Sequence, residues 1–168
     1  LAGSQDNGTE RFDGISNDWT LVWGGDGGYT EIDPANKNIM YTQNYYTTTF
    51  SQQKSVNGGA GWLPINTGLN NGDRGEFYIP YTLDENSPSN LYLGSYRIYK
   101  STTSGSTWTV ASGDLTIGAP HTITVVKVAR TNSNFVGAGA TDGTLSLSTN
   151  AGSTWSKISI ASLPARPV

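Results

Sequence analysis

Apolar residues along the chain occur in short runs in which β-branched or aromatic side chains alternate with polar ones. Such runs occupy residues 77–83, 97–100, 122–128 and 144–147. Each run is bounded by Gly, Asn, Asp or Ser, which are the residues that favour turns. No stretch keeps a 3.6-residue apolar period for three turns. The pattern therefore predicts many short strands and almost no helix.

These runs belong to an internal repeat that is marked by tryptophan. Four tryptophans stand at positions 19, 62, 108 and 155, which are 43, 46 and 47 residues apart. Three of them end a similar Ser- and Gly-containing turn, whereas the turn before Trp19 is degraded to Asp-Gly-Ile-Ser-Asn-Asp. Four strands in roughly 45 residues, repeated, are typical of a β-propeller blade. We therefore expect an all-β fold, a β-propeller of four-stranded antiparallel blades.

The phase of the repeat divides the chain into one incomplete blade and three complete ones. Residues 1–24 supply the last three strands of a blade, and residues 26–66, 73–112 and 120–160 supply one blade each. The tail at 165–168 stands where the next inner strand would begin. Three arrangements accommodate ends that are out of phase with the blades. In order of preference, they are a part of a larger propeller, a head-to-tail ring of two chains, and a closed four-blade monomer.

The repeated turn has a clear chemical basis. Ser and Asn side chains hydrogen-bond nearby backbone groups, and glycine supplies the positive φ that a tight turn needs. A large indole ring then packs beside each turn. The residues assigned to these structural turns are Ser55, Asn57, Gly59, Trp62, Ser101, Gly105, Trp108, Ser148, Asn150, Gly152 and Trp155.

This turn resembles the Asp-box of the BNR repeat, which occurs in sialidases, xyloglucanase-type glycoside hydrolases and sortilin-like receptors. The resemblance covers essentially the whole chain, but Asn57, Thr103 and Asn150 stand where the family has Asp. In that family the box is a structural turn away from the active site. The resemblance therefore implies the fold and no activity.

A glycine-rich segment contains the first candidate for a catalytic residue. Asp26 stands at the head of an expected inner strand, with glycine at 24, 25, 27 and 28 and with Tyr29 after it. The segment is similar to the Gly-Asp-x-Gly-Gly-aromatic context of a catalytic carboxylate in xyloglucanase-type propellers, which implies that role for Asp26. Asp73 holds the quasi-equivalent position one blade on. Inverting glycosidases place two carboxyls about 6.5–9.5 Å apart. The alternative, which we favour, is ordinary Asp-Gly turn chemistry.

Aromatic residues and a second turn complete the set of candidates. Tyr45 and Tyr46 belong to a polar and aromatic insertion, and with Tyr29 they are candidates for stacking on a sugar. A cross-strand aromatic ladder is the alternative for the insertion. The sequence Gln-Asp-Asn-Gly at 5–8 predicts a hairpin turn with positive φ at Asn7 and Gly8.

Composition narrows the class of function. Charged residues make up 14% of the chain, against roughly 25% in an ordinary domain, and the net charge is −3. Such a chain lacks the clustered cations of a nucleic-acid binder, and its short apolar runs do not predict a membrane span. The absence of cysteine excludes disulfides and thiolate metal sites. We expect no metal and no cofactor.

Two functional classes remain open. We favour a secreted or cell-surface bacterial module of a glycoside-hydrolase-like propeller that binds a glycan or a protein, or serves as a scaffold. The alternative is the catalytic portion of a xyloglucanase-type polysaccharide hydrolase that uses Asp26 and Asp73. Expected partners are a polysaccharide or an extracellular protein, together with the rest of a larger propeller or a second copy of the chain.

Overall fold

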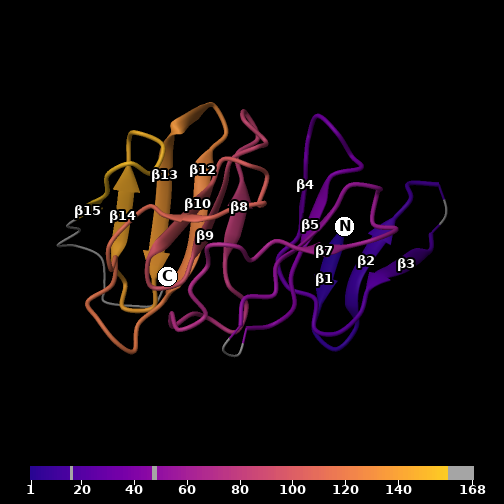
Figure 1. The fold of residues 1–168 in the computed structure, drawn as a ribbon, viewed down its shortest axis with the longest axis horizontal. Helices are drawn as coiled ribbons and strands as arrows, with labels where there is room; N and C mark the ends of the chain where they lie inside the picture. The colour runs from indigo at the N-terminus through magenta and orange to yellow at the C-terminus, as the bar shows by residue number, and fades with distance from the viewer. Residues whose placement is uncertain (16, 47–48, 159–168) are drawn as a thin grey trace.

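The computed structural model describes residues 1–15, 17–46 and 49–158, and within these ranges it has fifteen strands and no helix. The strands form four separate antiparallel sheets, which stand in a row (Figure 1). Blade 1 contains β1 (Ala2–Ser4), β2 (Gly8–Phe12) and β3 (Trp19–Trp23), and blade 2 contains β4 (Glu31–Ile32), β5 (Met40–Thr42), β6 (Gln53–Ser55) and β7 (Leu63–Pro64). Blade 3 contains β8 (Tyr81–Leu83), β9 (Leu91–Gly94), β10 (Ile98–Ser101) and β11 (Thr109–Val110), and blade 4 contains β12 (Ile123–Ala129), β13 (Asn132–Ala140), β14 (Leu145–Ser148) and β15 (Ser156–Ile158).

Each sheet is a meander in which strands that follow one another in the chain are hydrogen-bonded neighbours. This confirms the predicted all-β fold of antiparallel blades. Strand β8 is shorter than the run at 77–83 predicted, because Pro80 has no N–H and the ladder begins after it. The sequence predictions for residues 159–160 and 165–168 lie outside the described residues. No helix in the described part of the chain could cross a membrane.

The core lies between neighbouring blades. One cluster joins blades 2 and 3 and includes Tyr41, Phe50 and Tyr99, and a second joins blades 3 and 4. Every residue of β9 is buried, with its leucines in the first cluster and Tyr92 in the second. Side chains of a strand alternate between the two faces of a sheet. Blade 3 is therefore covered on both faces.

The repeated tryptophans hold consecutive blades together. Each indole N–H donates to a backbone carbonyl of the preceding blade, over distances of 2.9, 2.6 and 3.1 Å. The pairs are Trp62 with Val22, Trp108 with Ile65, and Trp155 with Ala111. Trp108 is only 3% exposed, whereas the other two rings are half-buried.

The turns before these tryptophans share one geometry. In each, the serine hydroxyl oxygen accepts the backbone N–H of the glycine four residues later, at 2.8–2.9 Å. The three glycines, Gly59, Gly105 and Gly152, have φ between 82° and 88°. This backbone region favours glycine because a Cβ atom would clash there. The same local turn therefore precedes each tryptophan, which stands directly before the last strand of its blade.

Candidate functional site

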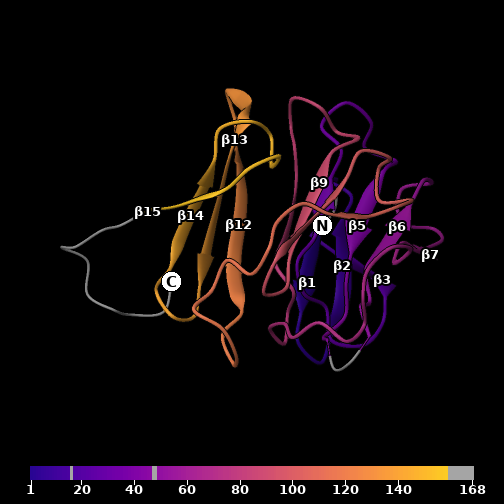
Figure 2. The ribbon, with the colours of Figure 1, turned by 60° about the vertical axis from the view of Figure 1, so that its left-hand side comes forward.

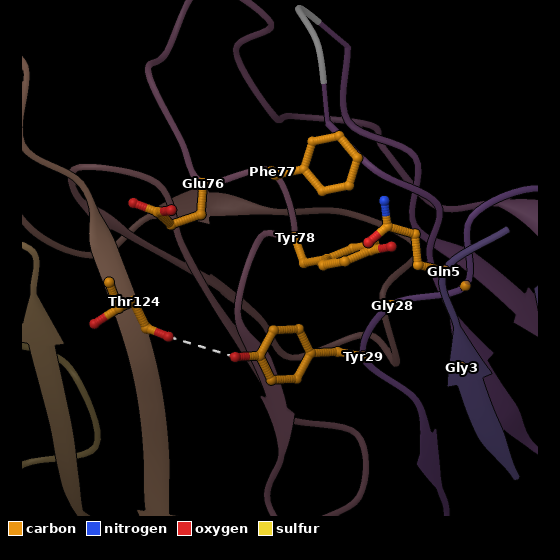
Figure 3. A pocket seen from close by; sticks show the side chains of 9 residues that line it. Gly3, Gln5, Gly28, Tyr29, Glu76, Phe77, Tyr78 and Thr124 are labelled. Carbon is orange, nitrogen blue, oxygen red and sulfur yellow. Dashed lines mark hydrogen bonds between the residues drawn. The ribbon is translucent and has the colours of Figure 1, made fainter.

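A pocket of about 540 Å³ opens where β4, β8 and β12 begin, which are the first strands of blades 2, 3 and 4. Figure 3 shows side chains from these three blades converging on it, together with Gln5 from the turn between β1 and β2. The lining residues are Gly3, Gln5, Gly27, Gly28, Tyr29, Glu76, Phe77, Tyr78 and Thr124. The pocket is thus assembled from segments that are far apart in the chain.

Aromatic rings form much of the pocket wall. Tyr29 is 38% exposed and Phe77 is 47% exposed, so both present free ring surface. Tyr45 stacks on Phe77 with the planes 9° apart and the centroids separated by 5.1 Å. Tyr78 lies against Gly28, where a Cβ atom would be 2.5 Å from Cδ1 of the ring. Glycine at position 28 is therefore required for Tyr78 to take this place.

Polar groups accompany the rings. The hydroxyl of Tyr29 donates to the carbonyl of Thr124 at 3.4 Å (Figure 3), and the hydroxyl of Thr122 donates to Oε1 of Glu76. Burial, and then the charge of Glu76, raise the pKa of Tyr29. The buried hydroxyl of Tyr78 has no hydrogen-bond partner among the described residues. Its pKa is raised by burial and then by the carboxylates of Asp26 and Asp6. Both tyrosines are therefore neutral hydrogen-bonding groups at neutral pH.

Asp26 joins the segment before β4 to the turn between β1 and β2. Its Oδ1 accepts the backbone N–H of Asp6 at 2.7 Å. The prediction of positive φ at Asn7 was wrong: φ is 65° at Asp6 and 84° at Gly8. A Cβ atom at Gly27 would collide with the carbonyl oxygen of Gly8. Glycine at position 27 therefore allows the backbone of the β1–β2 turn to pack closely against this segment. The Asp26 carboxylate accepts a hydrogen bond from that same turn.

Asp73 lies in the interior, with 3% of its surface exposed. Arg97 donates to it from two nitrogens, Nε to Oδ2 at 2.7 Å and Nη2 to Oδ1 at 2.9 Å. Tyr99 donates to Oδ2 at 2.6 Å and Ser95 to the same oxygen at 3.3 Å, while Nδ2 of Asn70 donates to Oδ1 at 3.0 Å. The Asp73 carboxylate raises the pKa of Arg97 by its hydrogen bonds. Both carboxylate oxygens are thus occupied within the fold.

The sequence candidates take different places around the pocket. Tyr29 lines it, and Tyr45 reaches it through its stack on Phe77. Tyr46 is instead a core residue, 9% exposed, and its hydroxyl donates to the backbone carbonyls of Asn71 and Asp73. Adjacent residues of an extended chain point in opposite directions, which separates the two tyrosines. No observation on Asp26 or Asp73 tests catalysis, and that assignment stays a prediction.

Sequence reasoning missed six of the residues that line the pocket. They are Gly3, Gln5, Glu76, Phe77, Tyr78 and Thr124. The apolar run at 77–83 predicts a strand at Phe77 and Tyr78, but both lie in the loop before β8, which begins directly after Pro80. That proline is a usable signal. Nothing in the sequence marks Gln5 or Thr124, because only the tertiary structure brings their segments together.

Comparisons with known proteins give likeness only at the level of structure. No family model matches the chain, and no curated protein matches it. The GH74 enzyme of Niastella koreensis is 21% identical, with a TM-score of 0.67 over 94% of this chain and 27% of that chain. The GH74 xyloglucanase of Xanthomonas campestris is 19% identical, with a TM-score of 0.72 over 97% of this chain and 28% of that chain. YCF48 of Cyanidioschyzon merolae is 14% identical, with a TM-score of 0.53 over 76% of this chain and 38% of that chain.

The chain thus spans little more than a quarter of the length of the two GH74 structures. Identities this low show likeness of fold and leave activity open. The four antiparallel sheets, their order in the chain and these neighbours agree on one architecture. The chain has the fold of consecutive β-propeller blades, similar to those of GH74 enzymes.

Proposed function

We propose that this chain is a glycan-binding module of a glycoside-hydrolase-like propeller and that the pocket at the heads of β4, β8 and β12 holds the glycan. The observation that carries the proposal is the exposed ring surface of Tyr29 and of the Tyr45–Phe77 stack beside polar groups in one pocket. Aromatic faces offer apolar area to the C–H face of a sugar, and carboxylate and amide groups offer hydrogen bonds to its hydroxyls.

The size and composition of the pocket support a ligand of a few sugar units. Ligand sites commonly have volumes of about 300–1,000 Å³ and combine apolar walls with a few polar groups. Glu76 and Gln5 supply such groups here. The likeness to GH74 xyloglucanase structures supports β-glucans as the class of glycan.

The proposal includes membership of the Asp-box class of propellers and an extracellular location. The Ser-to-Gly hydrogen bond that recurs in three turns supports the first. A composition rich in Gly and poor in charged residues supports the second.

The alternative is hydrolysis by Asp26 and Asp73. A catalytic carboxylate must have an oxygen free for the substrate, the leaving group or a water molecule. Asp73 is buried and bound on both oxygens, so it fails this condition. Asp26 uses only Oδ1, to accept a backbone N–H, and would therefore lack the second carboxylate of a catalytic pair. These contacts favour binding over catalysis for this chain.

Isothermal titration calorimetry with xyloglucan oligosaccharides tests the proposal. Phe77→Ala and Tyr29→Ala each remove one aromatic face, and we expect each to raise Kd about 2- to 10-fold. Phe135→Ala is the matched control, because Phe135 is a similarly exposed ring, 42%, on β13 and outside the pocket. Equal affinities in all four proteins would contradict the proposal.

Reducing-sugar release from the same glycans distinguishes the alternative. A binding module releases none. Release by the wild-type protein that disappears in Asp26→Asn, at an unchanged Tm, would establish catalysis instead, since an asparagine Oδ1 still accepts the N–H of Asp6.

A further inference from the structure

The pocket at the heads of β4, β8 and β12 carries charge of one sign. Among the described residues that line it, only Glu76 is charged at neutral pH, and no lysine or arginine accompanies it. The carboxylates of Asp26 and Asp6 lie outside this lining set but are close enough to raise the pKa of Tyr78, after the larger effect of its burial. The pocket is therefore an anionic environment with mainly aromatic walls.

Glu76 is half-buried and has one oxygen free of hydrogen bonds. Its Oε1 accepts the hydroxyl of Thr122 at the start of blade 4, which Figure 2 shows as a separate sheet beside the others. No described residue donates to its Oε2, and no described lysine or arginine forms an ion pair with it. Arg74, two residues earlier, is bound instead to Asp114 at 2.6 Å and to the carbonyl of His121 at 2.7 Å. The charge of Glu76 is therefore not neutralised by the described residues.

The carboxylate of Glu76 and the aromatic rings face the pocket from different sides. Figure 3 shows Glu76 on the side of Thr124, with Phe77 and Tyr78 on the opposite side. The ring of Tyr29 extends toward Thr124, and the charge of Glu76 is close enough to raise the pKa of Tyr29, after burial. A ligand that rests on the ring of Tyr29 would therefore have this carboxylate nearby.

This combination of groups suits a ligand with a positive charge. Aromatic faces attract an ammonium group by cation–π interaction, and a carboxylate accepts charge-assisted hydrogen bonds from it. Tyr29 and Phe77 present exposed ring surface for the first interaction, and Oε2 of Glu76 is available for the second. An anionic sugar, such as a uronic acid, would instead meet a like charge, which is unfavourable. Among sugars, the positive charge is found in amino sugars whose amine is free.

We propose that the glycan held by this pocket contains an amino sugar with a free, protonated amine, and that Glu76 binds this amine. The inference rests on the proposed function, because it requires that the pocket holds a glycan. The sugar ring packs on Tyr29 or Phe77, and its ammonium group donates to Oε2 of Glu76. Glu76 is then the residue that determines which glycan binds.

Calorimetric titration with three oligosaccharides of equal length tests the proposal. All three have β-1,4 linkages and differ only at carbon 2, which carries a hydroxyl in the glucose oligomer, an amine in the glucosamine oligomer and an acetamide in the N-acetylglucosamine oligomer. At about pH 6 a free carboxylate and an amine both carry charge. We expect the wild-type protein to bind the glucosamine oligomer at least about 5-fold more tightly than either of the others.

Two variants assign the preference to the pocket. Glu76→Gln removes the charge but keeps an oxygen that accepts the Thr122 hydroxyl. We expect it to reduce the preference for the amine to less than about 2-fold and to change the affinity for the glucose oligomer by less than about 2-fold. Glu85→Gln is the matched control, because it removes the same charge from a chain of net charge −3 at an exposed position outside the pocket. It should keep the full preference.

The outcomes separate this proposal from the one on which it rests. Equal affinities for the three oligosaccharides, together with weaker binding by Phe77→Ala, would overturn the role of the amine and leave the glycan-binding function supported. A preference that survives Glu76→Gln, or that is lost equally in Glu85→Gln, would also overturn it, because the attraction would then come from the overall charge. Failure of all three to bind would overturn both proposals.

Discussion

Asp73 shows how one buried carboxylate can organise a long connection between blades. It lies in the segment between β7 and β8, and its main partner, Arg97, immediately precedes β10. The hydroxyl of Tyr46 binds the carbonyl of the same aspartate. Glu76 and Phe77, three and four residues after Asp73 in the same segment, line the pocket. The ion pair therefore anchors the base of a loop whose tip lines the candidate site.

We expect Asp73→Asn to lower the free energy of unfolding by about 3–5 kcal/mol. The asparagine leaves the partly buried guanidinium of Arg97 without its counter-charge, and breaking one member of a buried pair is the costly change. Urea denaturation measures the difference. Glu85→Gln is the control, because the pair of Glu85 with Arg130 is exposed and should contribute less than about 1 kcal/mol. Equal losses in the two variants would contradict the anchoring role.

At the scale of the blade, packing between the faces of neighbouring sheets contributes more to stability than hydrogen bonding between the strands of one sheet. Several strands have only two or three residues, as in β4 and β11, and such short ladders contribute few hydrogen bonds. Trp108 fills the contact between blades 2 and 3, packing with Ile65 while its N–H reaches the carbonyl of that residue. A buried ring with a satisfied donor serves both the apolar and the polar side of the interface.

Trp108→Ala should therefore destabilise the protein by about 3–5 kcal/mol, the range for deleting a large buried aromatic side chain. Trp155→Ala should have a smaller effect, because that ring is only half-buried. Trp108→Phe separates the two contributions, since it keeps an aromatic ring and loses the N–H. Denaturant melts of the three variants provide the comparison, and a harmless Trp108→Ala would refute this account of the blade interface.

At the scale of the whole molecule, protection is uneven along the row. Blade 3 is covered on both faces, and every residue of β9 is buried, whereas Trp19 and Leu21 of β3 are exposed in blade 1. Local opening requires less free energy where few buried contacts are lost. The middle of the row is thus expected to open last.

Hydrogen exchange at low protein concentration should show the slowest amide exchange in β9 and β10 and faster exchange in β3. Uniform protection across the four blades would contradict this ordering.

The repeat itself was readable from the sequence because its determinants are local. A Ser-to-Gly turn and the tryptophan after it lie within eight residues, and short alternating runs between turns specify strands without help from distant parts of the chain. The all-β blade architecture could therefore be predicted. The length of β8 could not be read from its apolar run alone, because the run continues through Pro80, where pairing stops.

The candidate site was decided by the tertiary structure. Tyr45 and Tyr46 are adjacent and alike in the sequence, yet one stacks beside the pocket and the other is buried in the core. Asp26 and Asp73 occupy similar positions in the repeat, but only Asp73 pairs with an arginine, which lies 24 residues further along the chain in the turn between β9 and β10. Sequence periodicity determined the kind of blade, whereas the pocket depends on where three blades converge, and such convergence is a property of packing between distant segments.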